Sequence, residues 1–153
     1  MSIKEKLSAL GLTLPTAAAP VAAYVPAVKS GNLVFTAGQL PVVDGKLVKE
    51  GKVGSDVTAD DAKELAQICA LNALAAISLV AELDQIERVV RVGGFVNCAP
   101  GFTAIPGVVN GASELLIKIV GDVNGKHART AVGVAELPLN APVEIEMVVQ
   151  LKN

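Results

Sequence analysis

The amino-acid sequence predicts an α+β domain in which two helices pack on one face of a mixed β-sheet. Several short segments rich in Val are bounded by Gly, Pro and Asn turn residues, a pattern typical of strands. Two longer segments carry apolar residues at helical spacing. Their order along the chain is three strands, a helix, a strand, a helix and two strands. This order favours a two-layer α+β fold.

The chain opens on a predicted short helix. Ser2 followed by Glu5 is typical of a capping box, and Gly11 ends the apolar run that follows. Residues 12–23 contain two prolines and several alanines, which favours an irregular connector. No internal repeat or second domain is evident. We therefore expect residues 1–153 to form one domain, with the helix and connector in 1–23 and the core in 24–151.

The core elements follow from turn residues and periodicity. Pro26 makes the first strand an edge or bulged strand, and Thr58 with Asp61 caps the first long helix. Strands are expected at 24–28, 33–37, 46–48, 88–97, 129–136 and 143–151, and the two long helices at 58–83 and 106–120.

Composition predicts an oligomer. Hydrophobic residues make up 52% of the chain before its 14 glycines are counted, whereas ordinary soluble domains reach ~45–50% with glycine included. A sheet covered by helices on one side also needs something against its other apolar face. Subunits that pack sheet against sheet around a threefold axis would cover it, so we expect a homotrimer.

Charge and residue types exclude several classes of partner. The net charge is −2, the basic residues are scattered, and three Phe and one Tyr offer little to stack bases on, so nucleic acid is not expected. Cys69 and Cys98 make no disulfide framework, and no metal-ligand cluster is evident. The longest apolar stretch, 65–80, is interrupted and short for a membrane span. We expect a cytoplasmic protein without membrane contact.

Few residues could carry chemistry. Arg129 begins an otherwise apolar strand, where a guanidinium could clamp a carboxylate bidentately or form an internal ion pair. Glu144 and Glu146 alternate with apolar residues, as a site or as a solvated strand face would. His127, the single histidine, could shuttle protons or belong to the turn that precedes it. Tyr24 could contact substrate or lie at a rim.

Two segments resemble a known family. The first is Y-V-P-A-V-K-S-G-N-L-V-F-T-A-G-Q-L-P at 24–41, and the second is A-R-T-A-V-G-V-A-E-L-P followed by V-E-I-E at 128–146. The chain is identified from these as a member of the Rid (reactive intermediate deaminase, YjgF-like) family. The resemblance implies a chorismate-mutase-like fold, a homotrimer with clefts between subunits, no cofactor, and hydrolysis of enamine or imine intermediates to 2-keto acids and ammonia.

The resemblance also implies roles for individual residues. Arg129 matches the arginine that binds the substrate carboxylate, and Glu144 the carboxylate that orients the attacking water. Tyr24, Gly38 and Asn110 match residues that line the same cleft. Two positions depart from the family pattern, since Ala37 stands where a serine is usual and Ala131 where a cysteine is usual. Because the cysteine position acts mainly through its main chain, we keep Ala131 as a substrate-binding residue and expect altered substrate preference.

Other functions stay open from the sequence alone. An arginine in a cleft between subunits would bind a 2-keto acid without chemistry, so a non-catalytic carboxylate sensor is the main alternative. Endoribonuclease activity is less favoured because the chain has one histidine and an acidic balance. Chorismate mutase activity would need several cationic groups.

The final expectation concerns geometry. If the last two strands form a hairpin across 137–142, Arg129 and Glu144 share a face with their backbones about 20 Å apart. One small imine could not then reach both side chains of one chain. We therefore expect each site to be shared between neighbouring subunits.

Overall fold

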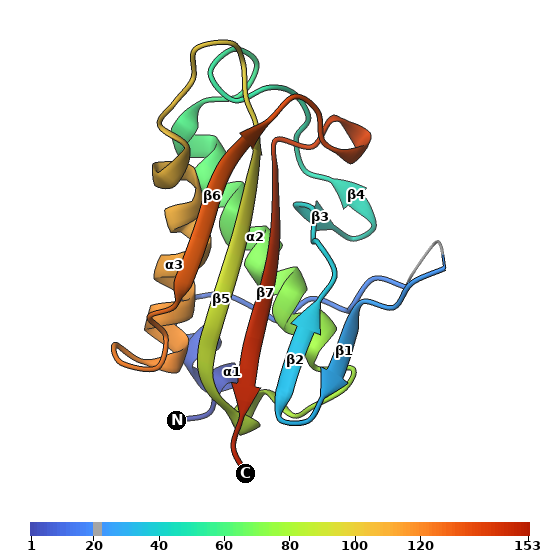
Figure 1. Ribbon diagram of the computed structural model, residues 1–153, viewed down its shortest axis with the longest axis vertical. Coiled ribbons are helices and arrows are strands. Elements are labelled where there is room, and N and C mark those ends of the chain that lie inside the picture. The colour runs from blue at the N-terminus through green and yellow to red at the C-terminus, as the bar shows by residue number, and fades with distance from the viewer. Residues whose placement is uncertain (20–22) are drawn as a thin grey trace.

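A five-stranded sheet backed by two long helices forms the body of the protein (Figure 1). The computed structural model describes residues 1–19 and 23–153; residues 20–22 of the predicted connector lie outside the described residues. The helices are α1 (Ile3–Ala9), α2 (Ala59–Ile77) and α3 (Ile105–Val120), with short 3-10 turns at Leu83–Gln85 and Pro138–Asn140. The strands are β1 (Ala27–Ser30), β2 (Leu33–Thr36), β3 (Val42–Val43), β4 (Lys46–Leu47), β5 (Ile86–Asn97), β6 (Ala128–Val134) and β7 (Val143–Leu151).

The sheet is mixed, as expected, in the order β1-β2-β7-β5-β6. β5 and β6 run parallel, and the other neighbours are antiparallel. A parallel pair needs a crossover connection, which α3 supplies between β5 and β6. β3 and β4 form a separate small ribbon, of which only the second strand was predicted.

The predicted hairpin between the last two strands is wrong. β5 lies between β6 and β7 and pairs with both of them. The residues between β6 and β7, including the turn at Pro138–Asn140, therefore bridge over the end of a third strand. Local turn residues gave no sign of the inserted strand, whereas the strand–helix–strand order of β5, α3 and β6 is typical of a parallel pair.

The core lies between the sheet and the helices. Along β7, five residues alternate to face the helices and are buried, as the sequence pattern predicted: Val143, Ile145, Met147, Val149 and Leu151. The helices α2 and α3 cross very closely, since a Cβ at Gly111 would lie 1.9 Å from the carbonyl oxygen of Lys63. Only glycine permits this approach.

The predicted N-terminal helix is confirmed. Ser2 and Glu5 form the capping box, and Leu7 is buried against the core. Lys6 Nζ donates to the carbonyl oxygen of Ile119 at the end of α3, at 2.8 Å. Among residues 1–19 and 23–153, no helix has the length and apolar character that a bilayer crossing requires.

Candidate functional site

Arg129 lies on the edge strand β6 and turns its side chain toward α3. Its register partner on β5 is Val92, which is fully buried on the helix side of the sheet. Cross-strand partners point to the same face. The half-buried guanidinium accordingly reaches α3, where Nη1 donates to Asn110 Oδ1 at 2.7 Å and to Ser113 Oγ at 3.2 Å, and Nη2 makes a longer contact with the Pro106 carbonyl oxygen at 3.4 Å.

The start of α3 arranges these acceptors. Pro106 occupies the first turn, where its missing N–H costs no hydrogen bond. Asn110 follows four residues later, so the two lie one turn apart on one helix face. Among the described residues, Nε and one Nη2 proton of Arg129 have no partner, and these nitrogens form one edge of the guanidinium. Such an edge donates two parallel hydrogen bonds to the two oxygens of a carboxylate.

Glu144 lies on the opposite, open face of the sheet. Its carboxylate rests over Gly38, where an added Cβ would lie 2.2 Å from Glu144 Oε1. Backbone hydrogen bonds between Gln39 and Ile145, at 2.8 and 3.0 Å, hold the Gly38 segment against β7. Burial raises the pKa of Glu144 above its ordinary 4.5, and the negative charge of Glu146 raises it further. This carboxylate therefore binds a proton more readily than an ordinary glutamate does.

Asn72 fixes the segment that carries Gly38. From α2 its Nδ2 donates to the carbonyl oxygens of Leu40 and Val42, both at 3.0 Å. The sequence predicts Asn72 on one face of a helix and as an interruption of the apolar run 65–80, with no role of its own. Because an amide on the apolar face of a helix needs hydrogen-bond partners, its position could have indicated that Asn72 holds another segment in place.

The structure brings Arg129 together with Asn110, and Glu144 together with Gly38, but it separates the two pairs within one chain. Arg129 is level with Val92 on β5 and Glu144 with Phe95. Arg129 and Glu144 are therefore three positions apart along the strands and two strands apart across the sheet. These offsets separate their backbones by about 14 Å. The expectation of a shared face at about 20 Å is therefore wrong, because it rested on the hairpin.

The remaining candidates lie at the margins of these pairs. Ala131 sits two residues beyond Arg129, on the same face, and packs against the core. Tyr24 precedes β1 instead of belonging to it, and its side chain is 53% exposed. A groove of about 190 Å³ between α2 and α3 contains neither Arg129 nor Glu144. No group of three or more His, Cys, Asp or Glu side chains suited to a metal ion occurs in the part of the chain that the structure describes.

His127 and Ser113 complete the surroundings of Arg129. Ser113 Oγ lies 2.9 Å from His127 Nε2, and His127 Nδ1 lies 2.6 Å from the carbonyl oxygen of Gly125. The histidine thus bonds the turn that precedes it, in agreement with the turn interpretation. Ser113 was missed; it lies three residues after Asn110 on α3 and is 92% buried, which makes it a polar group in need of partners.

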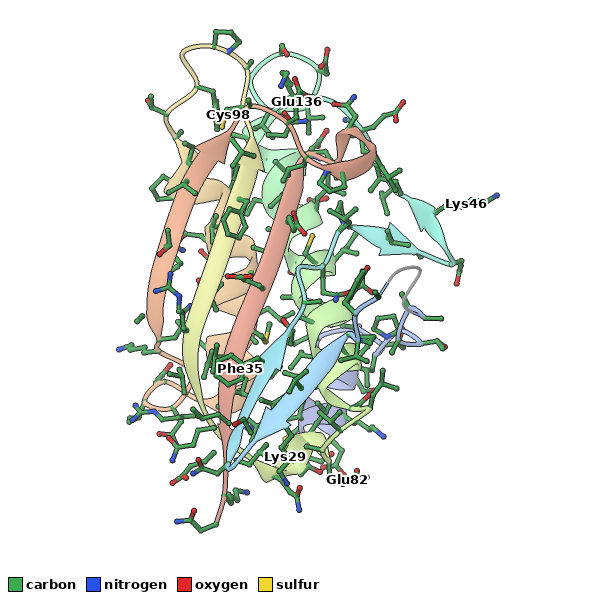
Figure 2. The ribbon with its side chains drawn as sticks, turned by 45° about the vertical axis from the view of Figure 1, so that its right-hand side comes forward. Lys29, Phe35, Lys46, Glu82, Cys98 and Glu136 are labelled. Atoms are coloured by element: carbon green, nitrogen blue, oxygen red, sulfur yellow. The ribbon has the colours of Figure 1, made fainter. Side chains whose placement is uncertain are left out.

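The open face of the sheet carries exposed apolar side chains beside Glu144. Phe35 is 44% exposed, Val28 51% and Val132 39%. Figure 2 shows Phe35 standing in front of the sheet, on the side away from the helices. Its register places it between Val28 on β1 and Val148 on β7. Several large apolar side chains exposed on one sheet face favour an interaction face.

Comparisons with known proteins agree with this architecture. A family model described as "YjgF/chorismate_mutase-like, putative endoribonuclease" matches residues 4–151. The chain is 40% identical to Protein TCP17 of Trypanosoma cruzi, over 99% of this chain and 95% of that protein. It is 30% identical to the 2-iminobutanoate/2-iminopropanoate deaminase of Dermatophagoides farinae, over 92% and 95%. The crystal structure of Atu1372 from Agrobacterium tumefaciens, a protein of unknown function, superposes with a TM-score of 0.88 at 43% identity, covering 97% of this chain and 91% of that one.

Proposed function

We propose, from the premise that this chain belongs to the YjgF/chorismate mutase-like family, that it hydrolyses small 2-imino acids at sites formed between two subunits. The similarity to a 2-iminobutanoate/2-iminopropanoate deaminase supports the substrate class. The observation that carries the proposal is the separation of an arginine anchor and a raised-pKa carboxylate onto opposite faces of one sheet.

Arg129 supplies the substrate anchor. The free edge of its guanidinium donates hydrogen bonds to the carboxylate of a 2-imino acid, while Asn110 and Ser113 accept from the other side of the group and hold it in place. Since the reacting carbon is bonded directly to that carboxylate, fixing one fixes the other. An anchor of this kind lowers the barrier by orienting the substrate.

Glu144 supplies the acid–base group. It takes a proton from water as the water oxygen adds to the imine carbon, and it returns that proton to the nitrogen, which gives the neutral carbinolamine. It then takes the proton of the new hydroxyl group and passes it to the amino group as the C=O bond forms and the C–N bond breaks, so that a 2-keto acid and ammonia leave. An enamine such as 2-aminoacrylate enters after tautomerising to the imine. A raised pKa suits a group that both takes and returns a proton near neutral pH.

Assembly of three copies would bring the two halves together. The apolar open face beside Glu144 needs a partner. The edge strand β6 presents Arg129 at a border of the sheet. A neighbouring subunit whose β6 edge meets this face would place its Arg129 over Glu144 and Gly38. A cyclic trimer would then hold three such sites.

The direct test is release of 2-keto acid from 2-aminoacrylate generated in situ, with wild type and Arg129→Ala compared against buffer. We expect wild type to accelerate release and Arg129→Ala to approach the buffer rate. Titration calorimetry with 2-oxobutanoate runs in parallel. Binding without any acceleration would replace the enzyme by a carboxylate sensor, which the hydrogen-bonded arginine also suits.

A further inference from the structure

A chain of hydrogen bonds behind Arg129 leads away from the substrate side. It runs from the guanidinium to Ser113 Oγ at 3.2 Å, from Ser113 to His127 Nε2 at 2.9 Å, and from His127 Nδ1 to the Gly125 carbonyl oxygen at 2.6 Å. It links α3, β6 and the loop between them. The imine hydrolysis described above uses neither Ser113 nor His127.

The direction of each hydrogen bond is fixed by the groups involved. A carbonyl oxygen can only accept, so Nδ1 of His127 carries a proton. In the neutral ring Nε2 is then an acceptor, and the Ser113 hydroxyl donates to it. The Ser113 oxygen is thereby free to accept from Arg129. Every member has one consistent role, so the neutral ring holds the arginine from behind.

We propose that Ser113 and His127 are positioning residues for Arg129, and that carboxylate binding at Arg129 is coupled to proton uptake by His127. The inference rests on the proposed role of Arg129 as the carboxylate anchor. When His127 gains a proton, Nε2 must donate to Ser113, and a second positive charge joins the arginine. A bound carboxylate offsets the repulsion between the two charges.

The pKa of His127 in the free protein agrees with this coupling. Burial lowers the pKa of His127 below its ordinary 6.5, and the charge of Arg129 lowers it further, while the hydrogen bond to Gly125 opposes both. A bound carboxylate removes part of the repulsive contribution, so it raises this pKa. By reciprocity, protonated His127 raises the affinity for the carboxylate.

The other charged residues on the elements next to His127 are exposed to solvent, and two of them form contacts with other residues. They are Glu114 and Lys118 on α3, Asp122 and Lys126 in the preceding loop, and Arg91 on β5. Glu114 pairs with Lys63 of α2 at 3.0 Å, and Arg91 donates to Thr130 on the open face. Arg129 is the charge that acts on His127 directly.

The single histidine makes the test direct, because its ring gives one set of NMR signals in untagged protein. The titration is followed with and without saturating 2-oxobutanoate. Glu144→Gln protein is used alongside wild type so that the other titrating group of the site is absent. We expect 2-oxobutanoate to raise the pKa of His127 in both proteins, and its dissociation constant to fall roughly fivefold between pH 8 and pH 5.5.

Two variants separate positioning from mere packing. His127→Gln keeps an acceptor for Ser113 but cannot gain a proton. In the Glu144→Gln background it should lose the increase in 2-oxobutanoate affinity between pH 8 and pH 5.5. Ser113→Ala should weaken binding severalfold at pH 8.

The outcomes distinguish two failures. If 2-oxobutanoate binds equally well to wild type and Arg129→Met, the anchor itself is wrong. If binding depends on Arg129 but the pKa of His127 stays unchanged, or His127→Gln keeps the full pH dependence, the coupling is refuted while the proposed function stands.

Discussion

The two halves of the candidate site are built in opposite ways. Arg129 lies in a ready-made set of acceptors, with Asn110, Ser113 and Pro106 all contributing oxygens. Glu144 has no hydrogen-bond donor among the described residues, rests against Gly38, and lies close enough to Glu146 for the two charges to repel. The fold surrounds the first group with hydrogen-bond acceptors and disfavours the charged form of the second. An anchor must stay fixed and charged, whereas a proton carrier must exchange its proton.

The largest expected effect comes from dividing the halves between two chains. The Arg129→Ala and Glu144→Gln proteins should each lose ~10²-fold or more of kcat/KM. If each site takes Arg129 from one chain and Glu144 from its neighbour, random mixing of the two variants restores about a quarter of the sites. Activity after subunit exchange, with exchange monitored by mass spectrometry, measures this. Complete exchange without recovered activity would place both residues in a single chain's site.

The second prediction separates anchoring from chemistry in the kinetics. Glu144→Gln keeps the shape of the side chain but cannot take up a proton, so kcat should fall ~10²–10⁴-fold while KM changes little. Arg129→Lys keeps the charge but loses the planar fork, so KM should rise about tenfold or more. Steady-state kinetics with an imine generated in situ provides both values. A fall in kcat alone for Arg129→Lys would contradict the anchor.

The third prediction uses two glycines that face two neighbouring glutamates. An added Cβ at Gly38 would lie 2.2 Å from Glu144 Oε1, and one at Gly93 would lie 2.8 Å from Glu146 Cγ. Both atoms belong to flexible side chains, so each alanine should displace a glutamate without unfolding the chain. We expect Gly38→Ala to lose about tenfold or more of kcat, and Gly93→Ala to keep most of it. Equal losses would show that Glu144 has no special role.

The sequence predicts features that depend on neighbouring residues better than features that depend on contacts between distant parts of the chain. The alternation along β7 is local and gave the correct burial, whereas the helical periodicity located α2 but not its end, which lies at Ile77 instead of near residue 83. The position of β5 between β6 and β7 is not local, because the residues that join β6 to β7 look like an ordinary turn. The error there placed Arg129 and Glu144 on the same face. Resemblance selected the two residues, but only the register shows that they face apart.

The residues that hold the two site groups in place were also not predictable from local sequence. Asn72 and Ser113 are single polar residues on apolar helix faces, where sequence cannot tell which backbone or side chain satisfies them. Both proved to hold the groups that the family pattern singles out. A buried polar residue close in sequence to a predicted site residue, as Ser113 is to Asn110, is a useful signal, provided that a partner can be assigned to it.

The smallest effect expected concerns stability. The pKa of Glu144 is raised on folding, so the folded state binds more protons than the unfolded state as the pH passes from the unfolded value near 4.5 to the higher folded value. Stability from this group therefore falls as the pH rises through that window. Glu144→Gln should raise Tm at pH 7 by about 1–3 °C, and the gain should vanish near pH 4.

Glu87→Gln, at an exposed position on β5, gives the baseline for losing one negative charge. Thermal melts across this pH range decide the matter: a Glu144→Gln protein that is less stable than wild type at pH 7 would mean that the neighbouring subunit, through a donor such as its Arg129, satisfies the carboxylate in the assembled protein.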